Sequence, residues 1–445
     1  MLTVGIIYLA AGAAVTLFFI LFGVTSIAEK KPRAAGISFA LAFIFGLIWF
    51  GTYFFMALPD YTYATAAAVV VIAIFLFFLP IGRRYRFDTS RIDARFDERD
   101  VMFAREEYEP GTEKYEKYYA MRPENKKADD KIRSLPELLT PGGRYYDADR
   151  SALVVALFDQ IEKLTTQVDG PVNETREKVD PVAMTREIKE ALTNLGADEV
   201  GVARLNPMHV YSHVGRGPET WGGPIENNHK YVIAFTLEMD YAQIEQAPRL
   251  AVTEETVRQY YNAALTAIAV AETIRERGYP ARAHISESNY QVIMPAVARD
   301  AGLGELGRNG YLISPRFGTR IRLGAVTTDL PLVTDRPIAF GVQEFCEICK
   351  KCAVNCPSRA IPLGDRVDVR GLPKWQLDVE RCITYWRLAG TDCGLCMKVC
   401  PFSHPGSIAH DIIRAGIKRS AFARYLSIYG DDLFYGRKFR YFRGH

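Results

Sequence analysis

The clearest chemical signal in this chain comes from its eight cysteines, which all lie between residues 346 and 400. They form two runs that end alike. The first has the spacing C-x2-C-x2-C-x3-C-P, and in the second a single cysteine is separated by a ten-residue gap from C-x2-C-x3-C-P. Such spacings let one turn of backbone surround a cube of iron and sulfide, and each proline ends that turn.

We therefore predict two 4Fe–4S clusters. In two-cluster ferredoxins the last cysteine of each run binds the other cluster. This rule gives one set of Cys346, Cys349, Cys352 and Cys400, and a second set of Cys356, Cys382, Cys393 and Cys396. Zinc would explain C-x2-C pairs but not two x3-C-P endings with no cysteine left over, and disulfides are the other weaker alternative. The chain is thus predicted to move single electrons.

The first 85 residues predict a membrane anchor. Three uncharged apolar stretches, Val4–Val24, Ala35–Leu58 and Thr65–Ile81, each approach the roughly 20 residues that a helix needs to cross a bilayer. A cleaved signal peptide would account for the first stretch alone, and no twin-arginine motif precedes it. A buried hairpin of a soluble core is the weaker alternative.

The positions of the cations predict an orientation. Lys and Arg lie in the first connection, 29–33, and after the third stretch, 83–86, whereas the second connection, 59–63, has none. Because cytoplasmic loops carry the excess of positive charge, we expect a multi-pass protein of the cytoplasmic membrane, in contact with lipid, with its large remaining part in the cytoplasm. That location suits cysteines kept for metal. The net charge of +3 is too small to argue for nucleic acid.

The remaining sequence predicts an α+β fold. Amphipathic helices are expected at Pro181–Leu195 and Thr253–Arg277, each closed by a glycine. Strands are expected at Glu199–Leu205, Tyr231–Glu238 and Arg320–Asp329. We divide the chain into an anchor (1–86), an extended charge-dense segment that covers the core (87–180), a catalytic domain (181–334), a cysteine domain (335–405) and a tail that returns to the catalytic domain (406–445).

A glycine-rich segment, Asp300–Gly310, precedes the cysteine runs. Its glycines would allow close approach to a bulky planar or anionic ligand, and their spacing fits neither a dinucleotide loop nor a P-loop. Together with the two cluster runs downstream, this segment closely resembles the corrinoid-dependent reductive dehalogenases. Further matches are Phe96–Asp100 with Met102–Arg105, Met239–Tyr241 with Ala247–Pro248, Gly278–Ala281, Phe402–Pro405, and Asp431–Asp432 with Tyr435–Gly436. The resemblance covers residues 88 to about 437.

The resemblance implies a nitroreductase-like corrinoid-binding domain with a ferredoxin-like two-cluster insert, here preceded by three transmembrane helices, and a corrinoid bound base-off. It implies that an organohalide exchanges carbon–halogen for carbon–hydrogen, with two electrons passed through the clusters to cobalt. A tyrosine would deliver the proton, and a lysine or arginine would stabilise the phenolate. A phenol, whose pKa is ordinarily near 10, donates poorly unless a cation stabilises its anion.

Carried onto this sequence, the resemblance implies Arg308 as the cation and Tyr260 as the proton donor. Tyr260 lies one helical turn after Thr256, as in the family, while Tyr261 is a rival and a core aromatic is the bland alternative. Further pocket residues predicted on the same grounds are Gly302, Gly304, Gly307 and Asn309.

Two positions depart from the family pattern or allow more than one role. Where some members have an asparagine, this chain has Ser286, with Asn289 three residues later. His404 is expected to contact the corrinoid or the surround of a cluster, or to be structural, because base-off binding argues against a cobalt ligand.

Two other functions compete with the dehalogenase. Epoxyqueuosine reductase shares a corrinoid site and paired clusters but acts on tRNA, and it uses an aspartate as proton donor and carries basic surface for RNA. A membrane-tethered ferredoxin is the non-catalytic alternative, and it leaves the 200 residues before the clusters unexplained. The sequence leaves open the organohalide, the electron donor (membrane-bound or soluble), the oligomeric state and any role of the spans beyond anchoring.

Overall fold

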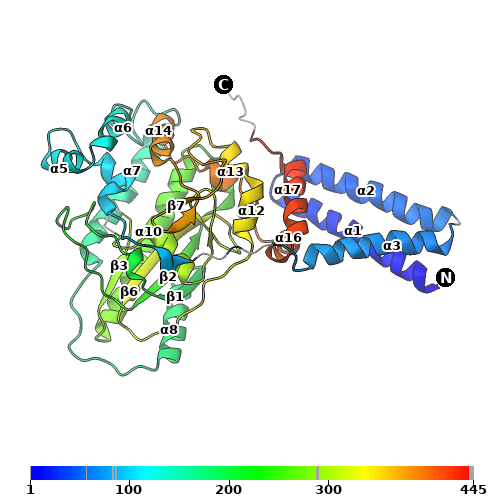
Figure 1. Ribbon diagram of the computed structural model, residues 1–445, viewed down its shortest axis with the longest axis horizontal. Coiled ribbons are helices and arrows are strands. Elements are labelled where there is room, and N and C mark those ends of the chain that lie inside the picture. Colours follow the sequence, from blue (N-terminus) through cyan, green and yellow to red (C-terminus); the bar gives the residue numbers. More distant parts are fainter. Residues whose placement is uncertain (1, 57, 83–84, 86–87, 287–289, 440–445) are drawn as a thin grey trace. The chain divides into compact units, whose positions relative to one another are not determined.

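The computed structural model describes residues 2–56, 58–82, 85, 88–286 and 290–439, and the chain divides into two compact units (Figure 1). The first unit consists of Met1–Arg86, Phe340–Lys351 and His404–His445. The second consists of Phe87–Ala339 and Cys352–Ser403. The boundary between the units thus falls inside the first run of cysteines.

Three long helices dominate the first unit: α1 (Leu2–Ala28), α2 (Pro32–Phe55) and α3 (Asp60–Phe78). Each is long and apolar enough to cross a membrane, so the three predicted apolar stretches are confirmed as helices. They pack through aromatic contacts near the start of α1, where the ring of Tyr8 stacks on that of Trp49 at a centroid distance of 4.3 Å. Arg83, Arg84 and Arg86, which helped to predict the orientation, lie outside the described residues.

The C-terminal tail packs on these helices within the first unit. It forms α16 (Ile408–Arg419) and α17 (Ala421–Tyr435), which lie across one end of the α1–α3 bundle in Figure 1. At the junction of the two helices, the Ser420 hydroxyl donates a hydrogen bond to the Leu76 carbonyl at 2.7 Å, and the Phe434 ring lies 4.8 Å from that of Phe22. The prediction that residues 406–445 return to the catalytic domain is therefore wrong, because the tail finds its apolar contacts on the anchor.

An antiparallel sheet organises the second unit, with strand order β1–β2–β6–β3. The strands are β1 (Glu199–Arg204), β2 (Tyr231–Glu238), β6 (Ile321–Thr328) and β3 (Ala281–His284). The three predicted strands are confirmed, and the antiparallel pairing agrees with an α+β fold. The edge strand β3 was not predicted, since it has four residues and two of them are Arg282 and His284.

Helices cover both faces of this sheet. Side chains alternate along β2, so Ile233 and Phe235 join the core formed with α7 (Ala148–Leu164), α8 (Pro181–Asn194) and α10 (Ala251–Glu276). Val232 and Ala234 face the opposite core, which includes α11 (Met294–Asp300). The sheet and α10 therefore form the rigid frame on which site residues can be held.

The segment predicted as extended (87–180) contains four α-helices, so the prediction is wrong for those parts of it. Besides α7, it forms α4 (Met102–Glu106), α5 (Glu113–Met121) and α6 (Pro123–Arg133). Its charges pair internally, as in the buried pair of Arg105 and Asp129 at 2.6 Å, and its tyrosines form a small core of their own. The helical pattern was missed because some of the residues that face inward are charged, so the spacing of apolar residues alone did not reveal these helices.

The other short elements are α9 (Tyr241–Ile244), β4 (Glu305–Leu306), β5 (Leu312–Ile313), α12 (Val342–Cys349), α13 (Lys351–Val354), β7 (Val367–Val369), β8 (Leu372–Lys374), α14 (Val379–Ala389) and α15 (Leu395–Lys398). Single 3-10 turns lie at Thr89–Arg91, Glu98–Asp100, Thr165–Gln167, Pro207–His209 and Pro401–Ser403.

Candidate functional site

Four cysteines of the second unit line one pocket, whose empty volume is about 450 Å³. They are Cys356, Cys382, Cys393 and Cys396, the set predicted to hold the second cluster. α14 carries Cys382, and α15 carries Cys396. All eight cysteines of the chain are free of disulfide bonds, which leaves their sulfurs available for metal.

The electrostatics of this pocket fit a cationic cluster. Burial, followed by the neighbouring sulfurs, raises the pKa of the Cys382 thiol to about 12. Burial has the same effect on Cys393, whose pKa is about 12, and raises the pKa of Cys396 well above its usual value. Buried sulfurs of this kind become thiolates together only when a cation compensates them, and iron does this. The backbone N–H of Ala360 donates to the Cys356 sulfur at 3.2 Å, a bond that tunes a cluster's potential.

The first predicted set of cysteines divides between the two units. Cys346 and Cys349 belong to the first unit on α12, whereas Cys352 and Cys400 belong to the second. Within the second unit, the charge of Cys352 is among those that raise the pKa of Cys396. The grouping of these four residues on one cluster stays a prediction.

Helix α10 and strand β6 bring a tyrosine and a cation together. The guanidinium of Arg322 lies 5.2 Å from the ring centroid of Tyr260, and its Nη2 donates a hydrogen bond of 2.7 Å to the Thr256 hydroxyl. Arg322 and Thr256 are buried, while Tyr260 is half-buried at the edge of the core. The predicted turn spacing of Thr256 and Tyr260 thus places both beside one cation.

Two further groups connect this cation to the cysteine pocket. Nη2 of Arg322 lies 3.8 Å from a carboxylate oxygen of buried Asp392, which directly precedes Cys393. Tyr311 lines the pocket, and its side chain interacts electrostatically with Arg322. Burial lowers the pKa of Arg322, but Tyr260, Tyr311 and Asp392 outweigh burial and raise it, so Arg322 is a permanent cation.

Arg308 lies elsewhere in the second unit. It is 1% exposed, and its Nη1 donates to the carbonyls of Pro362 at 2.7 Å and Gly364 at 2.8 Å. Its guanidinium also lies 4.4 Å from the ring centroid of Trp375. The role of Arg308 in stabilising the phenolate stays a prediction, and the cation described over the Tyr260 ring is Arg322. Sequence reasoning missed Arg322, although a lone arginine in the apolar run of β6 was a usable signal.

The glycine-rich segment is explained by chain packing. An added Cβ would lie 2.7 Å from the Arg336 carbonyl oxygen at Gly302, where φ is +79°, and 2.3 Å from the Ile313 carbonyl oxygen at Gly304. At Gly307 it would lie 2.7 Å from the side chain of Asn309. These three glycines thus permit close approach within the protein itself, and their contact with a ligand stays a prediction.

The remaining predicted pocket residues are placed as follows. Asn309 lines the cysteine pocket. Ser286 is buried, and Asn289 lies outside the described residues. His404 belongs to the first unit, where its ring nitrogens face Glu29 and Asp431.

Comparisons with known proteins agree with this site. A 4Fe-4S dicluster domain matches residues 345–404. The tetrachloroethene reductive dehalogenase of Sulfurospirillum multivorans is 35% identical over 311 residues, which cover 61% of this chain and 62% of that protein. One from Desulfitobacterium hafniense is 37% identical over 274 residues, covering 51% of this chain and 49% of that protein. An epoxyqueuosine reductase of Lactococcus garvieae is 31% identical over 123 residues, covering 24% and 31%.

Solved structures of reductive dehalogenases are also similar to this chain. The catabolic reductive dehalogenase NpRdhA in complex with 3-bromo-4-hydroxybenzoic acid superposes with a TM-score of 0.64 at 27% identity, covering 80% of this chain and 48% of that one. A reductive dehalogenase structure described for B12-dependent dehalogenation gives a TM-score of 0.58 at 29% identity, covering 70% and 47%. The chain spans roughly half to three fifths of the length of these relatives. In sequence and in fold, the chain is a homologue of the reductive dehalogenases.

Proposed function

We propose that this chain is a membrane-anchored reductive dehalogenase that replaces a carbon–halogen bond by carbon–hydrogen, using iron–sulfur clusters and a base-off corrinoid. The proposal assigns to this chain the activity for which its relatives are named, although the sequence match covers only part of each protein. Its main support is the cluster of Tyr260, Arg322 and Thr256, which leads through Tyr311 and Asp392 to the cysteine pocket.

The chain's own residues account for the proton. Tyr260 would hold it on the hydroxyl and release it to the carbon, leaving a phenolate. Arg322, fixed by its bond to Thr256, would stabilise that anion from 5.2 Å. Since Arg322 is buried and stays protonated, it would act as a fixed positive charge that needs no rearrangement during the reaction.

One observation fits a ligand beside these residues. Within the described part of the chain, Nε of Arg322 is buried and has no hydrogen-bond acceptor. A buried guanidinium N–H without an acceptor is costly, so the site is chemically incomplete without another group. When bound, a corrinoid would supply reduced cobalt, which breaks the carbon–halogen bond.

Metal analysis and halide release test this function. Protein produced with corrinoid available should contain cobalt near one atom per chain and iron near eight, if both clusters form. Under strong reductant it should release halide from at least one member of a panel containing tetrachloroethene, trichloroethene and 3-bromo-4-hydroxybenzoate, the compounds named for its relatives. Iron without cobalt would indicate a tethered ferredoxin, and turnover of epoxyqueuosine-modified tRNA without halide release would indicate the alternative enzyme.

We also propose that α1–α3 span the cytoplasmic membrane and that the second unit faces the cytoplasm. The support is the apolar length of the three helices and the positive charge of the connection after α1. Protease added to sealed right-side-out vesicles should then leave the second unit intact, and detergent should expose it. The electron donor, a membrane or a soluble carrier, stays open.

A further inference from the structure

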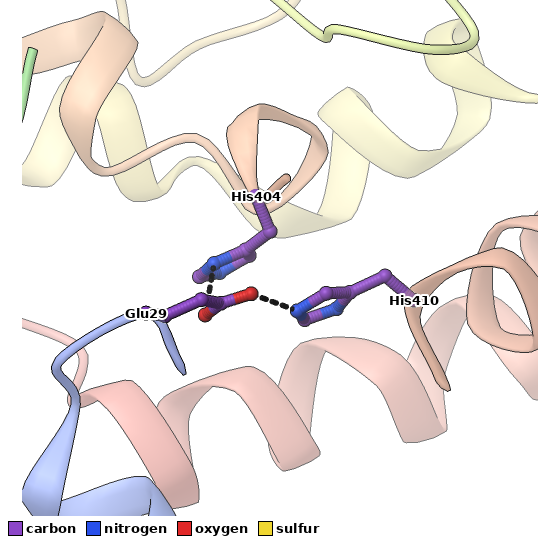
Figure 2. Close-up of side chains that lie close together, drawn as sticks. All are labelled: Glu29, His404 and His410. Atoms are coloured by element: carbon purple, nitrogen blue, oxygen red, sulfur yellow. Dashed lines mark hydrogen bonds and ion pairs between the residues drawn. The ribbon is translucent and has the colours of Figure 1, made fainter. Parts of the chain in front are cut away.

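Three side chains of the first unit have the chemistry and arrangement of metal ligands. Glu29 follows the end of α1, His404 precedes α16, and His410 lies in its first turn. One ligand atom of each lies within 4.8 Å of the other two. Figure 2 shows the Glu29 carboxylate between the two imidazole rings.

Both histidines direct a ring nitrogen at one carboxylate. Nε2 of His410 lies 2.7 Å from Oε1 of Glu29, and Nδ1 of His404 lies 3.5 Å from Oε2 (Figure 2). The rings are nearly parallel, with centroids 4.8 Å apart. Two nitrogens and a carboxylate that converge in this way form a two-histidine, one-carboxylate set, which binds divalent transition metals.

A second layer of charge fixes the orientation of His404. Its Nε2 lies 3.5 Å from Oδ1 of Asp431, and Asp431 is itself ion-paired with Lys351. Histidines that bind metal usually donate their other ring N–H to a carboxylate in this manner. If Nε2 carries the proton, Nδ1 presents a lone pair to Glu29.

A cation placed between Nδ1 of His404 and the Glu29 carboxylate would bind both the nitrogen lone pair and the anion. Nδ1 of His404 is buried and has no hydrogen-bond partner within the described residues. Glu29 is 4% exposed in its side chain, and its Oε2 also accepts a hydrogen bond of 3.3 Å from the Tyr435 hydroxyl. An anion buried at the end of an uncharged helix is costly unless it is compensated.

At His404, the distance to Glu29 favours a metal ion over an imidazolium as that cation. An imidazolium N–H bonds a carboxylate oxygen at about 2.7–2.9 Å, shorter than the 3.5 Å between His404 and Glu29. Ligand atoms bonded at about 2.0–2.1 Å to one tetrahedral zinc lie roughly 3.3 Å apart. The 2.7 Å contact of His410 would have to lengthen by roughly half an ångström for the same geometry.

We propose that Glu29, His404 and His410 bind a divalent cation, with Zn²⁺ as the best fit. Its fourth ligand would be water, and Asp431 with Lys351 would orient His404 behind it. Because Glu29 follows the first apolar helix and both histidines belong to the C-terminal segment His404–His445 of the same unit, the ion would bind that segment to the anchor.

Zinc binding to the detergent-solubilised full chain tests the proposal directly. After equilibration with ZnCl₂ and desalting, the protein should retain one zinc per chain, measured by mass spectrometry beside its iron and cobalt. Glu29→Gln and His410→Ala should each lower zinc affinity at least tenfold, and Asp431→Asn by 10- to 100-fold. The matched control is His213→Ala, which removes a half-exposed histidine of the second unit and should retain the zinc.

X-ray absorption at the zinc edge of the unmutated protein keeps the test independent of variant folding. Two imidazoles and oxygen ligands at about 2.0–2.1 Å would support the proposal, and sulfur ligands at about 2.3 Å would overturn it by locating the zinc on cysteines. The proposal is also overturned if the unmutated protein retains no zinc, or if folded Glu29→Gln and His410→Ala proteins retain as much as the control.

Discussion

Removing the charge of Arg322 should slow dehalogenation without unfolding the protein. A simple Arg322→Met change would strand buried Asp392, whose carboxylate lies 3.8 Å from the guanidinium, and leaving one partner of a buried pair costs several kcal/mol. The informative variant is therefore Arg322→Met combined with Asp392→Asn, compared with Asp392→Asn alone. Both proteins lack the carboxylate charge, so their difference isolates the cation.

The size of the effect follows from the separation of charges. With the 5.2 Å between the Arg322 guanidinium carbon and the Tyr260 ring centroid taken as the separation of charges, a unit charge at an effective dielectric constant near 20 contributes about 3 kcal/mol. This energy is gained when the phenol loses its proton and not before, so it lowers the barrier and not the substrate affinity. At 1.36 kcal/mol per factor of ten, kcat should fall roughly 200-fold with KM little changed.

The assay is halide release under strong reductant, with iron and cobalt content and thermal unfolding measured on each variant. Arg308→Met serves as the contrasting variant, since Arg308 donates to the carbonyls of Pro362 and Gly364. It should lower the free energy of unfolding by about 2–4 kcal/mol through the unpaired carbonyls, with kcat per folded, metal-loaded molecule largely retained. If Arg308→Met abolishes turnover in folded protein while the Arg322 double variant keeps full kcat, the assignment of the cation to Arg322 is refuted.

Three further predictions concern the donor, the cysteine pocket and the glycine segment. Tyr260→Phe should lower kcat by about 10²- to 10⁴-fold and Tyr261→Phe should leave it near that of the unmutated enzyme, and equal effects in metal-loaded proteins would remove the assignment of the donor. In folded protein stripped of iron, carbamidomethylation of Cys382 and Cys393 at pH 8 should be about a thousandfold slower than in guanidinium, since their pKa rises from 9.0 to about 12. Because these raised pKa values favour the protonated folded state, the stripped protein should lose stability as pH rises from 9 to 12, and a melting temperature that is constant over that window would contradict this. Gly304→Ala should lower the free energy of unfolding by about 1–3 kcal/mol through its clash with the backbone of β5, and a loss of turnover with an unchanged melting temperature would instead indicate a ligand contact.

The elements with regular periodicity were predictable from the sequence. The apolar stretches became α1–α3, and the amphipathic segment predicted at Pro181–Leu195 became α8 (Pro181–Asn194) with a difference of one residue at its end. The grouping of the second cysteine set also agrees with the structure, because its four residues, from three segments of the chain, line one pocket. Short-range pattern decides these features, so no knowledge of tertiary contacts was needed.

What failed depends on contacts between distant residues. The helices α5 and α6 are charge-dense, and their stability comes from pairs such as Arg105 with Asp129, which no local pattern announces. The destination of the tail was likewise decided by aromatic residues more than 300 positions earlier, as in the contact of Phe434 with Phe22. In both cases, the apolar or charged surface is covered by a distant part of the same unit, which local sequence patterns do not identify.

Arg308 and Arg322 are both buried, and they differ in the groups described around them. Arg308 stands among glycines, a context that suggested ligand contact, yet its described acceptors are main-chain carbonyls, which cannot change their charge. Arg322 faces groups that can: a phenol, and Asp392, whose pKa burial raises despite the nearby guanidinium. The charge of a buried cation changes the pKa of the titratable groups around it, and this is the reason for assigning the phenolate-stabilising role to Arg322 in our proposal. Arg322 lies in β6, inside a rigid sheet and opposite α10, and this position holds its charge beside Tyr260.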